Sequence, residues 1–171
     1  MTQFHPSWYL IYTRSKQEKK VAEQLSRYNI GNYLPLKREK RKWKDRLKTL
    51  EVPLFPSYVF VFLEDSWQYT VSLQLEGMCY YVKFDNKITH VSQQEIDNIR
   101  LLTSVNGELD VSYEHIRPGK KYLIQEGPLS GLSCEIVDFK GHHKFLVRIE
   151  ILQRAILMDV PAIYIGEAIL E

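Results

Sequence analysis

One short segment of the chain concentrates the side chains best suited to binding a polyanion. Residues 37–48 read KREKRKWKDRLK and carry eight basic and two acidic side chains, a net charge of +6. The rest of the chain has 15 basic and 19 acidic residues and sums to −4. Such a local basic patch is the electrostatic signature of a nucleic-acid partner, although most charge runs are simply solvated surface. Trp43 lies among these charges, where it could stack on a base or pack back on the domain.

The chain around this segment alternates without helical periodicity, which predicts a long hairpin with its tip at residues 43–46. The phosphates of a nucleic acid would be contacted most easily from that tip. The residues expected to bind nucleic acid are Lys40, Arg41, Lys42, Trp43, Lys44 and Arg46.

Residues 57–63 (SYVFVFL) form the strongest strand pattern in the chain. Strand alternation places three aromatic side chains on one face and three aliphatic ones on the other. The two sets are Tyr58, Phe60 and Phe62, and Val59, Val61 and Leu63. Because both faces are apolar, the sheet is either covered on both sides or exposes a hydrophobic depression that accepts a partner helix.

The sequence offers little for catalysis or for holding a metal. His142 and His143 are adjacent, so on a strand they would point to opposite faces and could not share an ion. Cys79 and Cys134 are too far apart in the chain for a metal knuckle or a redox pair, and we expect two buried thiols. No glycine-rich phosphate loop or nucleophile elbow occurs. We therefore predict a binding protein that is not an enzyme and uses no cofactor or metal.

Length and composition are those of an ordinary globular protein. The chain has 171 residues, of which 44% are hydrophobic and 26% charged. This size allows one large domain or two small ones. No stretch approaches the roughly 20 apolar residues needed to cross a bilayer, and Met1–Ser7 lacks the positive charge of an export signal. We expect a monomeric cytoplasmic protein with no membrane contact.

The first part of the chain alternates between strand and helix patterns. Ser15 and Glu18 form a capping box at the start of one predicted helix, and Asp65 can cap another. A second capping box begins at Ser92. The predicted elements are strand 8–13, helix 16–28, the basic hairpin, strand 57–63, helix 67–75, a hairpin of 78–84 with 88–91, and a helix that includes residues 96–103.

After residue 111 the chain shows only short strand patterns separated by turn residues. The predicted strands are 121–125, 133–138, 145–151, 155–160 and 164–165, a rhythm typical of a small closed barrel. Residues 105–110 (VNGELD) carry a turn signal and no core pattern. The predicted division is therefore a first domain over residues 1–106, a linker over 107–114 and a second domain over 115–171.

Three features in this order resemble the NusG family of transcription elongation factors. They are the Trp8-Tyr9 start of the first strand, LFPSYVFV at 54–61 after a basic hairpin, and PGKKYLIQEGPLSG at 118–131 opening the second domain. The resemblance implies an α+β protein. Its N-terminal domain would be a ferredoxin-like α/β sandwich with an antiparallel sheet, helices and the basic β-hairpin, followed by an SH3-like β-barrel called the KOW domain.

Two positions depart from the family pattern. Ser57 stands where the family usually has glycine, so it must adopt that backbone without glycine's freedom at positive φ. Cys134 stands where the last glycine of the KOW signature is usual.

The resemblance also implies partners. The N-terminal domain would bind the clamp helices of the largest catalytic subunit of RNA polymerase, through a pocket that includes Tyr9, Phe55, Pro56 and Tyr58. The hairpin would contact upstream DNA or nascent RNA, and the KOW domain would recruit a further protein. Overall likeness is greatest to the UpxY antiterminators of capsular polysaccharide operons, which implies a specialised elongation and antitermination factor.

Two other functions fit parts of the sequence. Residues 55–62 loosely resemble the aromatic strand of an RNA-recognition domain, where exposed rings stack on bases. KOW domains also occur in ribosomal proteins, which makes a ribosome-associated module the second alternative. Residues 111–171 have seven basic and eight acidic side chains, and this net charge of −1 argues against binding ribosomal RNA.

Overall fold

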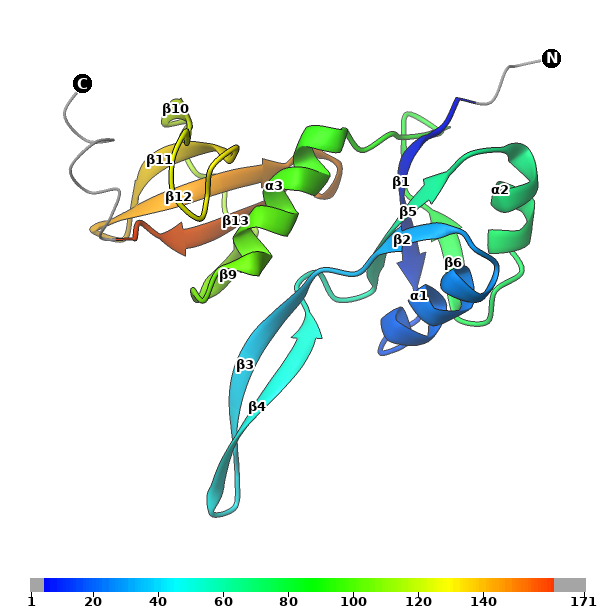
Figure 1. Ribbon diagram of the computed structural model, residues 1–171, viewed down its shortest axis with the longest axis horizontal. Coiled ribbons are helices and arrows are strands. Elements are labelled where there is room, and N and C mark those ends of the chain that lie inside the picture. The colour runs from blue at the N-terminus through cyan, green and yellow to red at the C-terminus, as the bar shows by residue number, and fades with distance from the viewer. Residues whose placement is uncertain (1–4, 162–171) are drawn as a thin grey trace. The chain divides into compact units, whose positions relative to one another are not determined.

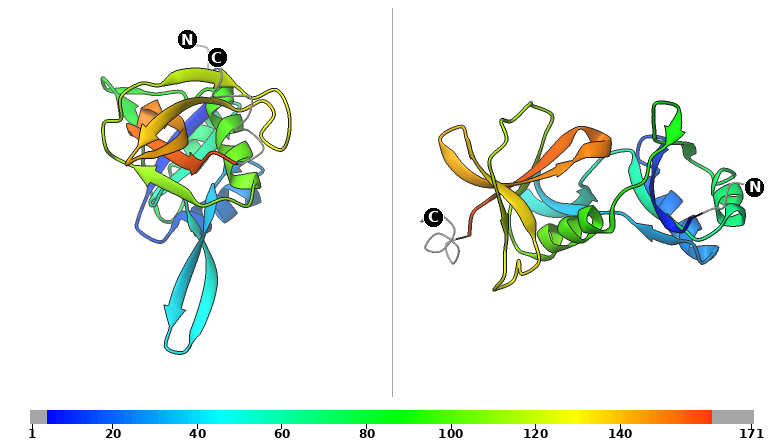
Figure 2. Two further views of the ribbon diagram at one scale, coloured as in Figure 1. Left: turned by 90° about the vertical axis from the view of Figure 1, so that its left-hand side faces the viewer. Right: turned by 90° about the horizontal axis from the view of Figure 1, so that it is seen from above.

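The computed structural model describes residues 5–161, and the chain divides into two compact units, Met1–Gln93 and Gln94–Glu171. Figures 1 and 2 show the elements of each unit. The first unit is an antiparallel sheet with two helices and a protruding hairpin. The second unit combines one helix with a β-rich region. The predicted fold class, mixed α and β with a β-rich C-terminal part, is confirmed.

The sheet of the first unit has four antiparallel strands in the order β2-β5-β1-β6. Their bounds are β1 Ser7–Thr13, β2 Gly31–Tyr33, β5 Tyr58–Leu63 and β6 Met78–Tyr81. The two central strands, β1 and β5, pair over six positions from Ser7↔Leu63 to Tyr12↔Tyr58. Both are rich in β-branched and aromatic residues, which pack well on a pleated surface.

Two helices, α1 (Glu18–Arg27) and α2 (Ser66–Ser72), pack against one face of this sheet. The core beneath them joins aliphatic side chains of α1 to the alternate residues of β1 and β5. Its buried members are Tyr9, Ile11, Val21, Leu25, Ile30, Val59, Val61, Leu63, Leu75 and Tyr81. The predicted face of Val59, Val61 and Leu63 is thus the helix-covered face.

The two predicted helix caps of this unit have different outcomes. Asp65 caps α2, because its carboxylate accepts a hydrogen bond from the Gln68 amide at 2.8 Å. The capping box at Ser15 is wrong: Gln17 is the N-cap of α1 and makes no side-chain capping bond. The Glu18 carboxylate instead accepts from the Ser57 amide at 2.7 Å, a residue 39 positions away in the chain.

Two hairpins extend from the first unit. The long one pairs β3 (Leu36–Trp43) with β4 (Arg46–Pro53), and its tip lies at residues 43–46 as predicted. The short one pairs β7 (Lys83–Phe84) with β8 (Lys87–Ile88). Both residues of the short turn, Asp85 and Asn86, have positive φ, which these residue types tolerate. The predicted strand over 78–84 is in fact divided between β6, in the main sheet, and β7.

The second unit contains helix α3 (Gln93–Ser104) and a five-stranded antiparallel sheet in the order β10-β11-β12-β13-β9. The strand bounds are β9 Leu109–Ser112, β10 Lys120–Leu123, β11 Ser133–Phe139, β12 His142–Ile149 and β13 Arg154–Asp159, with a 3-10 turn at Glu150–Leu152. Four of the predicted strands correspond to β10 to β13. The predicted strand at 164–165 lies outside the described residues.

Strand β9 was not predicted from the sequence. Residues 105–110 read as a turn without core pattern, yet Leu109 is buried and β9 pairs with β13 from Met158↔Leu109 to Ala155↔Ser112. The pairing partner is more than 40 residues away, so local propensity does not reveal it.

The two units divide at Gln93, ahead of the boundary predicted near residue 106. The reason is that α3 packs with the strands that follow it. The Asn98 side-chain oxygen accepts from the Ser133 amide at 3.0 Å, and Leu101 lies against Gly131. Among the described residues, no helix is long and apolar enough to span a membrane.

Candidate binding surfaces

The face of the four-stranded sheet opposite α1 and α2 is dominated by aromatic side chains. We call it the aromatic face, and it consists of Trp8, Tyr12, Tyr33, Phe55, Tyr58, Phe60, Phe62 and Tyr80. Successive strands present these rings in register, with Trp8 opposite Phe62 and Tyr12 opposite Tyr58. Cross-strand aromatic pairs of this kind stabilise the sheet and create a rigid apolar surface.

The accessible part of this face includes three neighbouring tyrosines, Tyr12, Tyr58 and Tyr80. The Tyr12 ring stacks on the Tyr80 ring at 5.0 Å and meets the Tyr58 ring edge-on at 5.2 Å. Tyr80 is 53% exposed, and the other two are half-buried. Desolvation raises the pKa of Tyr80 above 10, with smaller contributions from Tyr12 and Tyr58. The trio is therefore a cluster of contacting aromatic rings, at least one of which is largely exposed.

The structure separates the four residues expected to form a partner-binding pocket. Phe55 packs edge-on against Phe60 on the aromatic face, and Tyr58 lies on the same face. Tyr9 lies on the other face of the sheet, in the core beneath the helices, where burial raises its pKa. Phe55 is only 1% exposed, whereas Pro56 is exposed.

Sequence reasoning missed four residues of the aromatic face, Trp8, Tyr12, Tyr33 and Tyr80. Trp8 and Tyr12 alternate with Tyr9 and Ile11 along β1, so the period of two already placed them together. Tyr80 joins them because β6 pairs with β1 at Tyr12↔Tyr80. No local signal in the sequence indicates that β6 neighbours β1.

The turn before β5 is held in an unusual conformation that presents Phe55 and Tyr58. Ser57 has φ 69°, the left-handed region for which glycine is preferred, as the family pattern led us to expect. Its amide donates to the Glu18 carboxylate, and its carbonyl accepts from the Thr13 amide at 2.8 Å. These two bonds stabilise a backbone that serine would otherwise adopt only at a cost of about 1 kcal/mol.

The β3–β4 hairpin divides the predicted nucleic-acid contacts between two faces. Directly paired residues share a face, and alternate residues along a strand change face. Trp43 pairs with Arg46, and Arg41 pairs with Lys48, so these four residues lie on one face, which we call the tryptophan face. The opposite face carries Lys40 with Thr49 and Lys42 with Leu47. Lys44 lies in the turn itself, with φ 50°.

None of the hairpin's residues is buried, and residues 40–49, which include the tip, are all exposed. Trp43 is 67% exposed, which excludes the alternative that its ring packs back on the domain. Near the tip, the Arg41 guanidinium lies 3.4 Å from the Glu39 carboxylate. At the base, the Lys19 ammonium donates to the Glu51 carbonyl at 3.1 Å, and the Leu54 amide donates to the Pro35 carbonyl at 2.8 Å.

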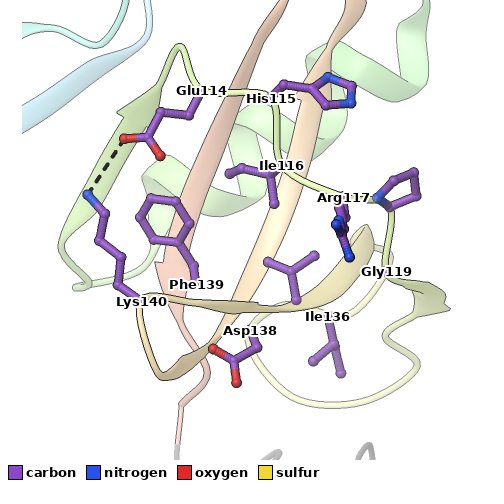
Figure 3. A pocket seen from close by; sticks show the side chains of 11 residues that line it. Glu114, His115, Ile116, Arg117, Gly119, Ile136, Asp138, Phe139 and Lys140 are labelled. Carbon is purple, nitrogen blue, oxygen red and sulfur yellow. Dashed lines mark ion pairs between the residues drawn. The ribbon is translucent and has the colours of Figure 1, made fainter.

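The second unit has an open hollow of about 510 Å³ between the segment before β10 and the β11–β12 turn. Figure 3 shows Ile116 and Phe139 in it, with charged side chains around them. Glu114 and Lys140 form an ion pair at 3.6 Å across one side, and the Lys140 ammonium also lies over the Phe139 ring. Its rim carries acidic and basic groups, so it shows no preference for an anion.

A partly buried ion pair stabilises the same unit. Arg148 donates to both carboxylate oxygens of Glu135, at 2.7 and 3.1 Å, and to the Ile116 carbonyl. The Gly119 amide donates to the same carboxylate, and these bonds lower the pKa of Glu135 although desolvation opposes them. A side chain at Gly119 would place its Cβ 2.1 Å from the Ile136 carbonyl oxygen, so only glycine fits there.

Within residues 5–161, no group of three or more histidine, cysteine or acidic side chains is placed to hold a metal ion. His142 and His143 begin β12 as exposed residues. The expectation of two buried thiols is wrong for Cys79, which is exposed on β6. Cys134 is buried, and desolvation raises its pKa to about 12.

Comparisons with known proteins agree on one family. Residues 6–100 match the family model described as "Transcription termination factor nusG". The chain is 25% identical over 169 residues to the "Transcription termination/antitermination protein NusG" of Lactococcus lactis subsp. lactis, a match that covers 91% of this chain and 89% of that protein. The fold is similar to the solved structure titled "Domain interaction in Thermotoga maritima NusG", with a TM-score of 0.50, 20% identity, and coverage of 90% and 92% of the two chains.

Proposed function

We propose that this chain, which belongs to the NusG family of transcription factors, docks on RNA polymerase and suppresses pausing and termination. Members of this family are transcription factors and not enzymes, in keeping with a molecule whose surfaces suit binding. We further propose that it acts at particular operons, such as capsular polysaccharide loci. The overall sequence likeness to the UpxY antiterminators supports that narrower role.

The observation that carries the proposal is the aromatic face with its tyrosine trio. Tyr12, Tyr58 and Tyr80 pack ring against ring and are accessible, and tyrosine is enriched among the residues that dominate protein interfaces. An apolar sheet surface of this kind suits an amphipathic helix, which supports the clamp helices of the largest polymerase subunit as the partner. Phe55 is a buried member of this face and Pro56, next to it in the chain, is exposed, whereas Tyr9 lies in the core on the other side of the sheet.

Co-elution of the purified protein with core RNA polymerase tests the docking. The Tyr12→Ala, Tyr58→Ala double variant should lose about thirtyfold in affinity or more, because one central truncation already costs about 2 kcal/mol when it removes an interface anchor. The matched control is Tyr28→Ala, since Tyr28 is 50% exposed at the end of α1, away from the aromatic face. Unchanged co-elution of a folded double variant would contradict the proposed docking surface.

The hairpin is proposed to contact upstream DNA or nascent RNA once polymerase has bound the protein. Its basic tip would then be held close to the nucleic acid, so that weak phosphate contacts gain effective concentration. Phosphate contacts carry little sequence information, and they would therefore add retention rather than selectivity. Crosslinking from the hairpin tip within a transcribing complex, followed by a run-off assay past a terminator, would test this role.

The C-terminal unit is proposed to be a KOW domain that recruits a further protein. The segment 111–171 has a net charge of −1, which is unfavourable for binding a polyanion. The rival function is an RNA-binding or ribosome-associated module. Tight, salt-sensitive binding of ribosomal RNA by the full chain, retained after neutralisation of the hairpin, would favour that rival.

A further inference from the structure

The β3–β4 hairpin is not uniformly basic, although its sequence suggests so. The tryptophan face carries three cations around one exposed aromatic ring: Arg41, Arg46 and Lys48 around Trp43. The opposite face has three cations, Arg38, Lys40 and Lys42, which are paired with Glu51, Thr49 and Leu47, and it carries no aromatic ring. Only one face therefore combines a stacking surface with several phosphate-binding groups.

The charges of the tryptophan face also lower the stability of the hairpin. Arg41 and Lys48 are directly paired across the strands, and like charges in that position destabilise a β-ladder. The Glu39 carboxylate at 3.4 Å offsets part of the charge of Arg41. A negatively charged ligand lying across this pair would relieve the repulsion, whereas a neutral ligand would not.

The ring of Trp43 decides which form of nucleic acid fits. Stacking on an aromatic side chain requires an open base face, and unpaired nucleotides provide one. In a duplex the base faces are covered by their neighbours, so the ring would contribute only after unstacking them. The 67% exposure of Trp43 beside three cations is thus useful on a single strand and largely unused on a duplex.

We infer that the hairpin binds single-stranded nucleic acid through the tryptophan face alone, with an unpaired base on Trp43 and its phosphates at Arg41, Arg46 and Lys48. The inference rests on the proposed contact between the hairpin and nucleic acid, and it specifies that the nucleic acid is single-stranded. The shared chemistry is an unpaired base with flanking phosphates, which either an RNA transcript or a separated DNA strand supplies.

The experiment measures binding of the full chain to labelled oligonucleotides in the absence of polymerase, by fluorescence anisotropy at several salt concentrations. The ligands are a uridine-rich RNA, a thymidine-rich DNA strand and a DNA duplex of equal length. We expect both single strands to bind more tightly than the duplex, and the tighter of the two identifies the source. Equal or tighter duplex binding would overturn the inference.

Variants test the ring. Trp43→Ala should weaken single-strand binding roughly tenfold, the effect of losing one stacked base, and leave duplex binding nearly unchanged. Trp43→Phe should retain most of the affinity. The matched control is Leu47→Ala, because Leu47 is 75% exposed at the same tip but on the opposite face. An unchanged single-strand affinity in Trp43→Ala would refute the stacking contact.

A pair of double variants tests the face. One double variant combines Arg41→Gln with Lys48→Gln, and the other combines Lys40→Gln with Lys42→Gln. Each removes two positive charges from the exposed hairpin, so both change the net charge equally. The first pair should lower the salt slope on single strands by roughly 1.4, since each phosphate contact contributes about 0.7. The second should change it little. Equal losses would show that only the total charge matters. Co-elution with polymerase is measured separately for all variants, so a failure here is distinct from a failure of docking.

Discussion

The four-stranded sheet and the β3–β4 hairpin are both antiparallel β-structure in one unit, yet different forces stabilise them. The sheet is packed against α1 and α2 on one face, where central residues such as Ile11 and Val59 are fully buried. The hairpin has no buried residue, so its two strands are held together by backbone hydrogen bonds. The turn at Lys44 and Asp45 fixes the register in which they pair. Residues of the sheet are therefore constrained by packing, whereas those of the hairpin tip are available for binding.

The largest effect that can test this contrast is a cavity in the sheet. Ile11→Ala removes a fully buried side chain from the core beneath α1 and α2 and should lower the free energy of unfolding by about 3 kcal/mol. Leu47→Ala, an equally apolar truncation on the hairpin, should change it by less than about 0.5 kcal/mol. Urea unfolding followed by fluorescence compares the two, and similar losses would contradict the contrast.

A second test concerns the turn where the hairpin returns to the sheet. Glu18→Ala removes the acceptor of the Ser57 amide and should cost about 2 kcal/mol, as expected for a hydrogen bond to a charged group. Glu18→Gln retains an oxygen acceptor and should cost less. Glu23→Ala on the exposed side of α1 is the control for helix propensity and charge. If all three variants unfold at the same urea concentration, the Glu18–Ser57 bond does not stabilise the turn.

The sheet should also lose stability at high pH. Desolvation raises the pKa of Tyr81 from 10 to about 12, although its hydrogen bond with Ser72 opposes the shift. The phenol therefore ionises first in the unfolded chain, so its contribution is complete below pH 10 and is lost as pH rises toward 12. By pH 11 the loss from this group is about 1.4 kcal/mol.

Tyr81→Phe isolates this contribution, because it removes the phenol and retains the ring. Between pH 9 and 11.5 the unfolding free energy of this variant should fall less steeply than that of the unchanged protein. Tyr28→Phe, at a site 50% exposed, should follow the unchanged protein. Parallel curves for Tyr81→Phe and the unchanged protein would show that the buried hydroxyl does not contribute.

The smallest effect, and the one of opposite sign, belongs to the hairpin. Arg41→Gln with Lys48→Gln removes a like-charge pair and should leave stability unchanged or raise it by up to about 0.5 kcal/mol. The same substitutions should weaken single-strand binding. Thermal unfolding at low salt, where surface repulsion is strongest, is the appropriate measurement. A clear loss of stability would mean that these residues support the fold.

The features that could be predicted from sequence are those set by near neighbours. The alternation of Tyr58, Phe60 and Phe62, the hairpin tip at residues 43–46 and the Asp65 cap all depend on residues a few positions apart, and each is confirmed. The strained φ of Ser57 also follows, because a family position that usually holds glycine predicts positive φ.

The features that could not be predicted depend on distant partners. Glu18 fits a local capping box with Ser15, but its carboxylate instead accepts a hydrogen bond from the Ser57 amide, which only the tertiary fold brings close. Strand β9 forms only because β13 has an edge to pair with. Tyr9 was assigned to the pocket by its motif, although alternation along β1 places it with Ile11 beneath the helices.

The contacts at the base of the hairpin determine where its tip can reach. Eight residues per strand, at about 3.4 Å each, make an arm roughly 27 Å long. A tilt of about ten degrees at the base would move the tip by roughly 5 Å, more than the 3.4 Å rise between neighbouring nucleotides of a DNA strand. The hydrogen bond from the Lys19 ammonium to the Glu51 carbonyl thus lets α1, an element outside the hairpin, influence the direction of this arm.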